Sequence, residues 1–89
     1  MNHLSIQVFG KVQGVFYRAN AAEKARELCL TGFARNEADG SVRIEAEGNA
    51  ENLNDFLEWN RHGPERARVD KLEYLYGGDL KHFSDFTIQ

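Results

Sequence analysis

The chain has 89 residues, 42% of them hydrophobic and 28% charged, and carries a formal net charge of −3 at pH 7. This length provides one compact core, so we expect a single domain over residues 1–89. The acidic balance argues against a nucleic-acid partner, which would require a surplus of Lys and Arg. No apolar run approaches the ~18 residues needed to span a bilayer, and the start of the chain has no secretory signal, so we expect no membrane association.

Cysteine and histidine usage limits the disulfide and metal chemistry. The only cysteine, Cys29, cannot form an intramolecular disulfide. A small chain without disulfides is typical of a reducing compartment, so we expect a cytoplasmic protein. We also expect it to be a monomer. His3, His62 and His82 are scattered without metal-ligand spacing, and we expect no metal site and no cofactor.

The first part of the chain predicts a strand, a glycine-containing segment and a helix. Residues 4–8 alternate between apolar and polar side chains, as in a half-buried strand. Residues 10–17 form the glycine-containing segment. Residues 18–30 are rich in Ala, Glu, Lys and Leu, with apolar positions at helical spacing. We expect Cys29 to be buried on this helix and Gly32 to end it.

The rest of the chain predicts a hairpin, a second helix and two more strands. The Asp39-Gly40 pair is a hairpin turn signal between a short strand and its return strand. Asn49 is a suitable N-cap for the second helix, and Gly63, followed by proline, ends it. The predicted strands are residues 33–36, 42–46, 69–76 and 85–88.

The resulting order, β-α-β-β-α-β with a short final strand, predicts the ferredoxin-like split β-α-β fold of the α+β class. In this fold one mostly antiparallel sheet carries both helices on one face. The first helix then begins at the sheet edge where the second strand ends. One strand separates the two, so the backbones of Arg18 and Asn36 should lie roughly 10 Å apart. One ligand could therefore touch both side chains.

The segment from Gly10 to Arg18 has the features of an anion site. Unpaired N–H groups and the positive end of the helix dipole attract anions to a helix N-terminus. Gly10 and Gly14 permit the backbone to curl, and Arg18 adds a planar fork that can bond two phosphate oxygens. These features alone leave open a plain loop with a surface arginine. The spacing of the Walker P-loop is absent.

Asn36 is an unusual residue for its predicted position, because asparagine is depleted in strands. One interpretation is a turn residue that leads into the Asp39-Gly40 pair. The expected position beside Arg18 favours a functional role instead. A neutral amide can hold water through both its oxygen and its NH2 group.

Two segments resemble the signatures of a known family. The pattern V-x-G-x-V-Q-G-V-x-Y-R at residues 8–18 resembles the first signature of the acylphosphatases. The pattern G-F-A-R-N-x-x-x-G-x-V at residues 32–42 resembles the second. Both have the order and separation found in the family, and the similarity extends over nearly the whole chain.

The resemblance implies hydrolysis of acyl phosphates to a carboxylate and inorganic phosphate, without a metal or a covalent intermediate. It implies that Arg18 and the loop amides bind the phosphoryl group, and that Asn36 orients the attacking water. Such a role fits phosphoryl transfer, which requires mainly positioning and electrostatic stabilisation. The loop amides are those of Val12, Gln13, Gly14, Val15, Phe16 and Tyr17.

Two positions depart from the family pattern. Tyr17 replaces the phenylalanine or methionine that is usual beside the arginine. Phe16 occupies a variable position where many members have glycine. If that position requires a positive φ, phenylalanine is strained there, and substrate affinity could suffer.

Two other classes of function are weighed against hydrolysis. Glu45 and Glu47 are expected on a solvated strand face, which would be acidic and has no aromatic residue for stacking RNA bases. RNA binding is therefore disfavoured. The second alternative is a module that binds acyl phosphates or handles carbamoyl groups, as found fused in larger maturation proteins. We expect a free-standing domain instead.

Overall fold

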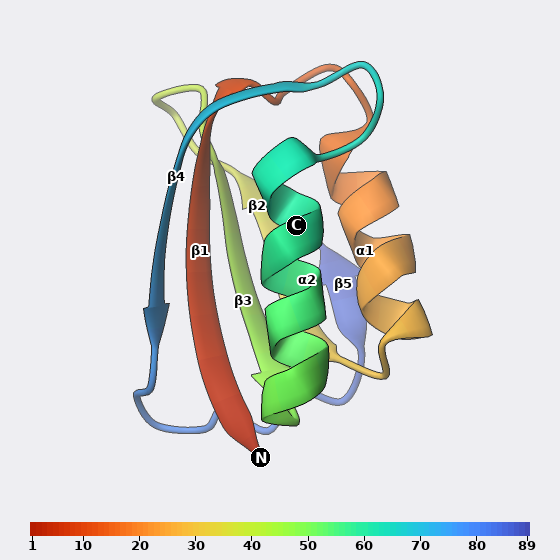
Figure 1. Cartoon of the computed structure of the whole chain (residues 1–89), viewed down its shortest axis with the longest axis vertical. Coiled ribbons are helices and arrows are strands. Elements are labelled where there is room, and N and C mark those ends of the chain that lie inside the picture. The colour runs from red at the N-terminus through yellow and green to blue at the C-terminus, as the bar shows by residue number, and fades with distance from the viewer.

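Two helices and five strands follow one another in the predicted order in the computed structural model, which describes residues 1–89 (Figure 1). The fold prediction is confirmed. None of the helices is long and apolar enough to cross a membrane. The elements are β1 (Asn2–Lys11), α1 (Tyr17–Glu27), β2 (Thr31–Asn36), β3 (Val42–Gly48), α2 (Ala50–His62), β4 (Arg68–Tyr76) and β5 (Phe86–Ile88).

The five strands form one sheet in the order β4-β1-β3-β2-β5. All neighbouring pairs are antiparallel except β2 and β5, which are parallel. Strand β3 therefore separates β1 from β2, as predicted. The register places Val8 opposite Val42, and Val42 opposite Asn36. Asn36, the last residue of β2, therefore lies level with Val8 of β1 across the sheet.

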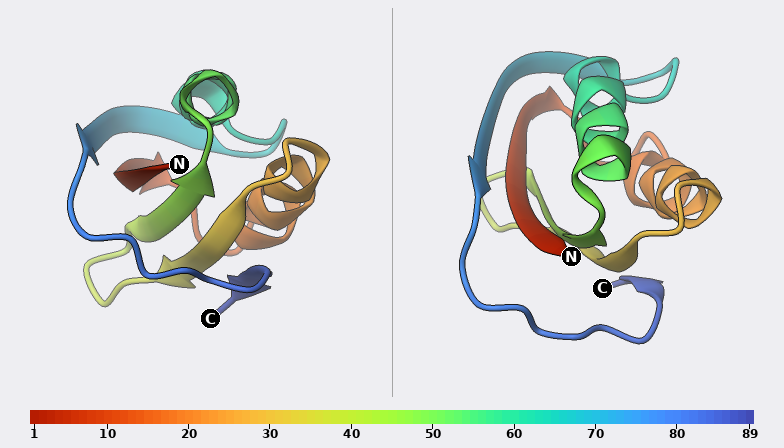
Figure 2. Two further views of the ribbon diagram at one scale, coloured as in Figure 1. Left: turned by 90° about the horizontal axis from the view of Figure 1, so that it is seen from below. Right: turned by 60° about the horizontal axis from the view of Figure 1, so that its bottom comes forward.

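The hydrophobic core lies between the sheet and the two helices, which cover the same face (Figure 2). Strand residues reach this core at alternate positions, because successive side chains of a strand point to opposite faces. Helix α2 contributes Leu53, Phe56 and Leu57, and α1 contributes mainly alanines. The core side chains from these elements are Leu4, Ile6, Val8, Tyr17, Ala21, Ala22, Ala25, Ala34, Val42, Ile44, Ala46, Leu53, Phe56, Leu57 and Phe86.

Both ends of α2 match their prediction. The side-chain oxygen of Asn49 accepts a hydrogen bond of 2.8 Å from the backbone N–H of Asn52, which caps the helix. Gly63 has a φ of 70° and follows the last helical residue. Its N–H donates to the carbonyl of Trp59 at 2.9 Å.

The C-terminal end of α1 differs from its prediction, since the helix stops at Glu27. Cys29 takes the left-handed conformation with a φ of 57°, and its N–H donates to the carbonyl of Arg26. The N–H of Leu30 donates to Ala25, which completes a Schellman motif and returns Leu30 to the core. Cys29 is therefore exposed, and its predicted burial is wrong.

Gly32 does not end the helix, contrary to our expectation, because it lies inside β2. A side chain at this position would meet the neighbouring strand. A Cβ atom there would stand 1.8 Å from the carbonyl oxygen of Glu45. Glycine is thus required at position 32 by the close approach of β3.

The sheet face opposite the helices is not solvated over its whole area. The segment that joins β4 to β5, residues 77–85, runs across this face (Figure 2). Glu47 is 1% exposed and accepts hydrogen bonds from the backbone N–H groups of Lys81 and His82, at 2.6 and 2.9 Å. Glu45 is also buried. The prediction that the two glutamates form a solvated face is therefore wrong.

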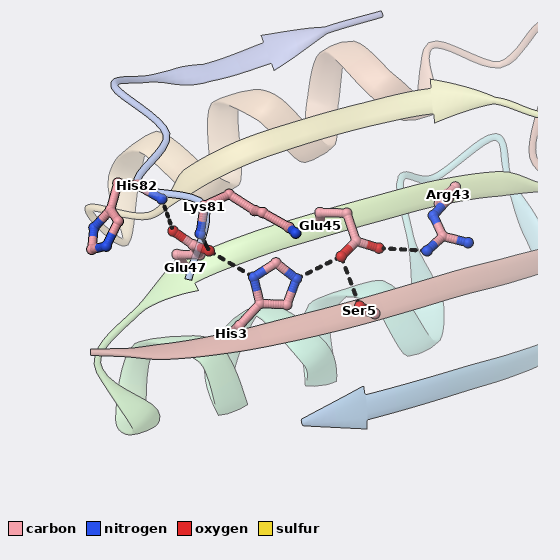
Figure 3. A network of polar contacts seen from close by, with 7 residues as sticks. All are labelled: His3, Ser5, Arg43, Glu45, Glu47, Lys81 and His82. Atoms are coloured by element: carbon pink, nitrogen blue, oxygen red, sulfur yellow. Dashed lines mark hydrogen bonds and ion pairs between the residues drawn. The ribbon is translucent and has the colours of Figure 1, made fainter. Parts of the chain in front are cut away.

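The two buried glutamates are bridged by His3 (Figure 3). The Nδ1 atom of His3 lies 2.7 Å from Glu47, and its Nε2 atom lies 2.5 Å from Glu45. Ser5 donates to Glu45 at 2.7 Å, and Arg43 forms an ion pair with it at 3.1 Å. Each ring nitrogen of His3 thus faces its own carboxylate, and the network fastens the segment 77–85 to the sheet.

Opposing effects set the pKa values of this network. Burial favours the neutral form of His3, but hydrogen bonds and the charges of Glu47 and Glu45 outweigh burial and raise the pKa of His3. Burial likewise opposes ionisation of Glu47. The backbone N–H of Lys81, the side chain of His3 and the backbone N–H of His82 outweigh it and lower the pKa of Glu47.

Candidate active site

The topology brings the loop after β1 and the end of β2 to one cavity of about 290 Å³. Arg18 and Asn36, which are 18 positions apart in the sequence, both line this cavity. The expected meeting of the two side chains at one sheet edge is thus present in the structure. The complete lining is Val12, Gly14, Phe16, Tyr17, Arg18, Ala19, Asn36 and Ile88.

Asn36 faces the helix side of the sheet. It follows the buried Ala34 by two residues, and side chains two apart in a strand share a face. The Oδ1 atom of Asn36 is buried and has no hydrogen-bond partner within the protein. Buried polar atoms in folded proteins nearly always have a partner, so this oxygen marks a place where a ligand or water molecule is accepted.

The backbone N–H groups of the loop are free of intramolecular hydrogen bonds. No backbone N–H of residues 12–16 is a donor to another backbone carbonyl. The N–H groups that bond to side chains belong to other parts of the chain. Helix α1 also lacks the side-chain cap that α2 has in Asn49. The start of α1 therefore keeps its positive end available to an anion.

The two glycines of the first signature have different roles. Gly14 lies in the loop with a φ of 74°, and open space surrounds the position of its missing Cβ. Gly10 belongs to β1, at a register shift against β4, with a φ of 132°. A Cβ there would stand 2.2 Å from the carbonyl oxygen of Arg68. Gly10 therefore serves strand packing rather than loop curling, and the loop proper is 12–16.

Phe16 has a positive φ, the condition under which the sequence predicts a strained phenylalanine. Its φ is 62° and its ψ is 25°, which is the left-handed helical region, and it stands immediately before α1. Its side chain is 67% exposed. The strain condition is thus met, because a bulky L-residue seldom adopts this conformation.

Tyr17 is a structural anchor under the loop. Its ring is buried, and its hydroxyl donates to Asn60 of α2, 2.7 Å from the side-chain oxygen and 3.1 Å from the carbonyl oxygen. Burial raises the pKa of this hydroxyl. The replacement of phenylalanine or methionine by tyrosine is accommodated here because Asn60 supplies the acceptor.

Arg18 is held by the residue that follows the last strand. Its Nη1 atom donates to the carbonyl oxygen of Gln89 at 2.6 Å. Arg26, near the other end of α1, makes the equivalent bond to the carbonyl of Phe86, also at 2.6 Å. The two arginines therefore fasten α1 to β5, and one guanidinium N–H of Arg18 is used while the others remain for a ligand.

Gln13 makes a connection that the sequence analysis missed, because only its backbone was considered. Its Nε2 atom donates to the carbonyl oxygens of Glu37 and Ser41, at 2.8 and 2.9 Å. These residues belong to the turn between β2 and β3. The side chain thus ties the loop to the hairpin that carries Asn36. In the sequence, the sign of this connection is the long amide side chain of Gln13 between Val12 and Gly14.

A family model described as Acylphosphatase matches residues 4–88. The chain belongs to the acylphosphatase family. The matched region contains both segments on which the resemblance rested, residues 8–18 and 32–42. An acylphosphatase from Methylococcus capsulatus is 46% identical to the chain over 88 residues, which cover 99% of this chain and 96% of the relative.

Solved structures of two relatives have the same fold. The crystal structure of acylphosphatase from Bacillus subtilis matches with a TM-score of 0.96 and 31% identity, covering 100% of this chain and 99% of that one. The crystal structure of full-length HypF, in a phosphate- and nucleotide-bound form, matches with a TM-score of 0.91 and 26% identity. There the match covers 99% of this chain but 12% of HypF.

Other candidate chemistry does not assemble in this acylphosphatase fold. No group of three or more His, Cys, Asp or Glu side chains is arranged to hold a metal ion. Cys29 lies at the end of α1 away from the loop. The polar side chains of the cavity are therefore those of Arg18, Asn36 and Tyr17, and the hydroxyl of Tyr17 is engaged by α2.

Proposed function

We propose that this chain hydrolyses acyl phosphates to a carboxylate and inorganic phosphate in the cavity that joins Arg18 to Asn36. The observation that carries the proposal is the unpartnered Oδ1 atom of Asn36, which lines the same cavity as the uncapped start of α1. The activity follows from membership of the acylphosphatase family. The cavity geometry supports separate roles for Arg18, the loop amides and Asn36.

The phosphoryl group is held by the segment from Gly10 to Arg18, and within it by the amides of residues 12–17. Five N–H groups without internal partners, together with the positive end of α1, suit the oxygens of a phosphate. Arg18 adds a charged fork that bonds two phosphate oxygens. Its hydrogen bond to Gln89 holds the guanidinium in place before substrate binds, which lowers the entropy lost on binding.

Asn36 positions the water. Its Oδ1 atom accepts a hydrogen bond from the water and directs the oxygen lone pair at phosphorus. As the new P–O bond forms, the bond between phosphorus and the acyl oxygen breaks, and the carboxylate leaves. The water proton passes to an oxygen of the transferred phosphate. A carboxylate is a good leaving group, so positioning and charge stabilisation suffice without a strong base or a metal.

The fused-module alternative is less well supported than a free enzyme. The chain covers 96% of the Methylococcus relative but 12% of HypF. We propose that residues 1–89 act as one acylphosphatase-like domain. We also propose that this domain is monomeric and cytoplasmic and works without a cofactor. We propose no nucleic-acid partner either, because the sheet face that would have to stack bases carries Glu45 and Glu47 and is partly covered by residues 77–85.

The proposed function is tested by a steady-state survey in buffer containing EDTA. Benzoyl phosphate, acetyl phosphate, carbamoyl phosphate and the monoester p-nitrophenyl phosphate are compared. We expect turnover of the acyl phosphates, at the same rate with and without EDTA, and little turnover of the monoester. Activity confined to the monoester, or activity that EDTA removes and Mg²⁺ or Zn²⁺ restores, would reject the mechanism.

A further inference from the structure

Phe16 presents a large apolar surface at the mouth of the cavity. Its side chain is 67% exposed, although its backbone is held in the left-handed region. Its ring makes none of the aromatic pairs of the fold. The exposed ring therefore adds little to packing while its backbone is strained. Strain of this kind tends to persist at positions that contact ligands.

Ile88 supplies a second apolar surface to the same cavity. It is the last residue of β5 and is 49% exposed. The next residue, Gln89, holds the guanidinium of Arg18 through its carbonyl oxygen. Arg18 is the one charged side chain in the cavity lining. A phosphoryl group on Arg18 would thus leave the rest of its molecule beside the two exposed apolar side chains.

We propose that Phe16 and Ile88 form the subsite for the acyl group, and that this subsite favours apolar and above all aromatic acyl groups. This inference rests on the proposed function, because it takes the phosphoryl group to lie on Arg18 and the loop amides. The face of the Phe16 ring can stack on a planar benzoyl group, whereas acetyl and carbamoyl groups offer it little surface. Covering on the order of 40 Å² of apolar surface corresponds to about a fivefold gain in affinity.

The surroundings of Phe16 limit the size of the favoured acyl group. Phe16 also borders a second hollow of about 280 Å³, so its ring is not closed in by neighbouring structure. The hollow is mostly polar, since its lining includes Asn20, Glu65 and Arg66. Beyond Phe16, most of the lining residues are therefore polar. The subsite suits an acyl group the size of benzoyl better than a long aliphatic chain.

The test compares kcat/KM for benzoyl phosphate and acetyl phosphate in variants with and without the apolar surfaces. Phe16→Ala removes the ring but keeps a Cβ atom on a residue in the left-handed conformation. Phe16→Gly removes both the ring and the Cβ atom. Ile88→Ser removes the second surface. Leu75→Ser is the matched control, because Leu75 is 69% exposed but lies on β4 outside the cavity. Binding of benzoylphosphonate and acetylphosphonate, measured by calorimetry, reports the same preference without turnover.

We expect the wild-type enzyme and Leu75→Ser to prefer the benzoyl compounds. Each of the Phe16 variants and Ile88→Ser should lower the benzoyl-to-acetyl ratio about fivefold, mainly through KM. In Ile88→Ser, which leaves the phosphate-binding loop intact, the inhibition constant of inorganic phosphate should be unchanged. An unchanged ratio in all three site variants would overturn the subsite while leaving hydrolysis itself established. A wild-type enzyme that hydrolyses neither compound would overturn the proposed function, and the subsite with it.

Discussion

The side-chain amide of Gln13 donates a hydrogen bond of 2.8 Å to the carbonyl oxygen of Glu37, the residue that follows Asn36. This bond crosses from the loop that precedes α1 to the hairpin that follows β2. The loop with the proposed phosphate-binding amides is therefore tied directly, by one side chain, to the hairpin that carries the proposed water-binding amide.

Replacement of this side chain should misplace the two halves of the site. We expect Gln13→Ala to lower kcat/KM by about 10-fold or more, because small displacements in an active site are costly, and to lower the free energy of unfolding by about 1 kcal/mol. Gln7→Ala is the control, since Gln7 also donates to the hairpin, at Ser41, but from β1. For both variants, steady-state kinetics measures kcat/KM and urea unfolding measures the free energy of unfolding. Equal kinetic losses in the two variants would contradict a specific role for Gln13.

Substitutions of Arg18 and Asn36 should change kcat and phosphate affinity in different ways. Arg18→Ala should raise the phosphate inhibition constant and lower kcat by about 10²–10³ or more, because a charged donor to the phosphoryl group is lost. Asn36→Ala should lower kcat by a similar factor while phosphate affinity stays nearly wild type. Melting curves establish that each variant is folded.

Arg26→Ala separates phosphate binding from the fastening of β5. Arg26 bonds to the carbonyl of Phe86 as Arg18 does to that of Gln89, but it does not line the cavity. We expect near-normal kinetics in this control. If Asn36→Ala keeps normal turnover, or loses phosphate binding as severely as Arg18→Ala, the water-positioning role is wrong.

Inorganic phosphate should bind as a competitive inhibitor and stabilise the fold. A ligand at ten times its Kd adds about 1.4 kcal/mol to the free energy of unfolding if it binds the folded state alone. For a domain of this size that corresponds to a rise in Tm of roughly 5–10 °C. The rise should be absent in Arg18→Ala and absent with chloride at equal ionic strength. A non-competitive pattern would place the anion site elsewhere.

The strain at Phe16 should be visible as stability gained on its removal. We expect Phe16→Gly to raise the free energy of unfolding by up to about 1 kcal/mol, because glycine adopts a φ of 62° without a Cβ clash. The exposed ring contributes little packing that could offset this gain. Phe16→Ala should give no such rise. Urea unfolding of the three proteins makes the comparison, and a less stable glycine variant would show that the ring packs after all.

The network around His3 should make stability depend on pH. The pKa of His3 is raised from 6.5, so its contribution is complete below pH 6.5 and is lost as the pH rises through the folded-state value. The pKa of Glu47 is lowered from 4.5, so its contribution is complete above pH 4.5 and is lost as the pH falls through the folded-state value. The network therefore stabilises the fold most between these two ordinary values.

His3→Gln tests this dependence because glutamine keeps hydrogen bonding but carries no charge. The stability difference from wild type should be largest near pH 5.5 and should shrink above pH 6.5, as the raised pKa of His3 is passed. His82→Asn is the control, since His82 contacts Glu47 through its backbone N–H alone. Urea unfolding across pH 4.5 to 9 provides the data. A difference that stays constant with pH would mean that the pKa of His3 is the same in the folded and unfolded states.

The elements and the meeting of Arg18 with Asn36 could be predicted from the sequence because local signals and topology rules determine them. Period-two alternation marked β1, and the Asn49 cap and Gly63 marked the ends of α2. Once the order of elements is known, the split β-α-β fold has few ways to connect them. The start of α1 and the end of β2 then necessarily share a sheet edge.

Tertiary structure alone decided which polar residues are buried and which side chains join the parts of the site. The alternation around Glu45 and Glu47 is that of a solvated face, and no local pattern shows that residues 77–85 cross it. The same holds for Gln13, whose partners at Glu37 and Ser41 are distant in sequence. Hydrogen bonds between distant segments depend on where the folded chain brings them, and periodicity within one segment contains no information about that path.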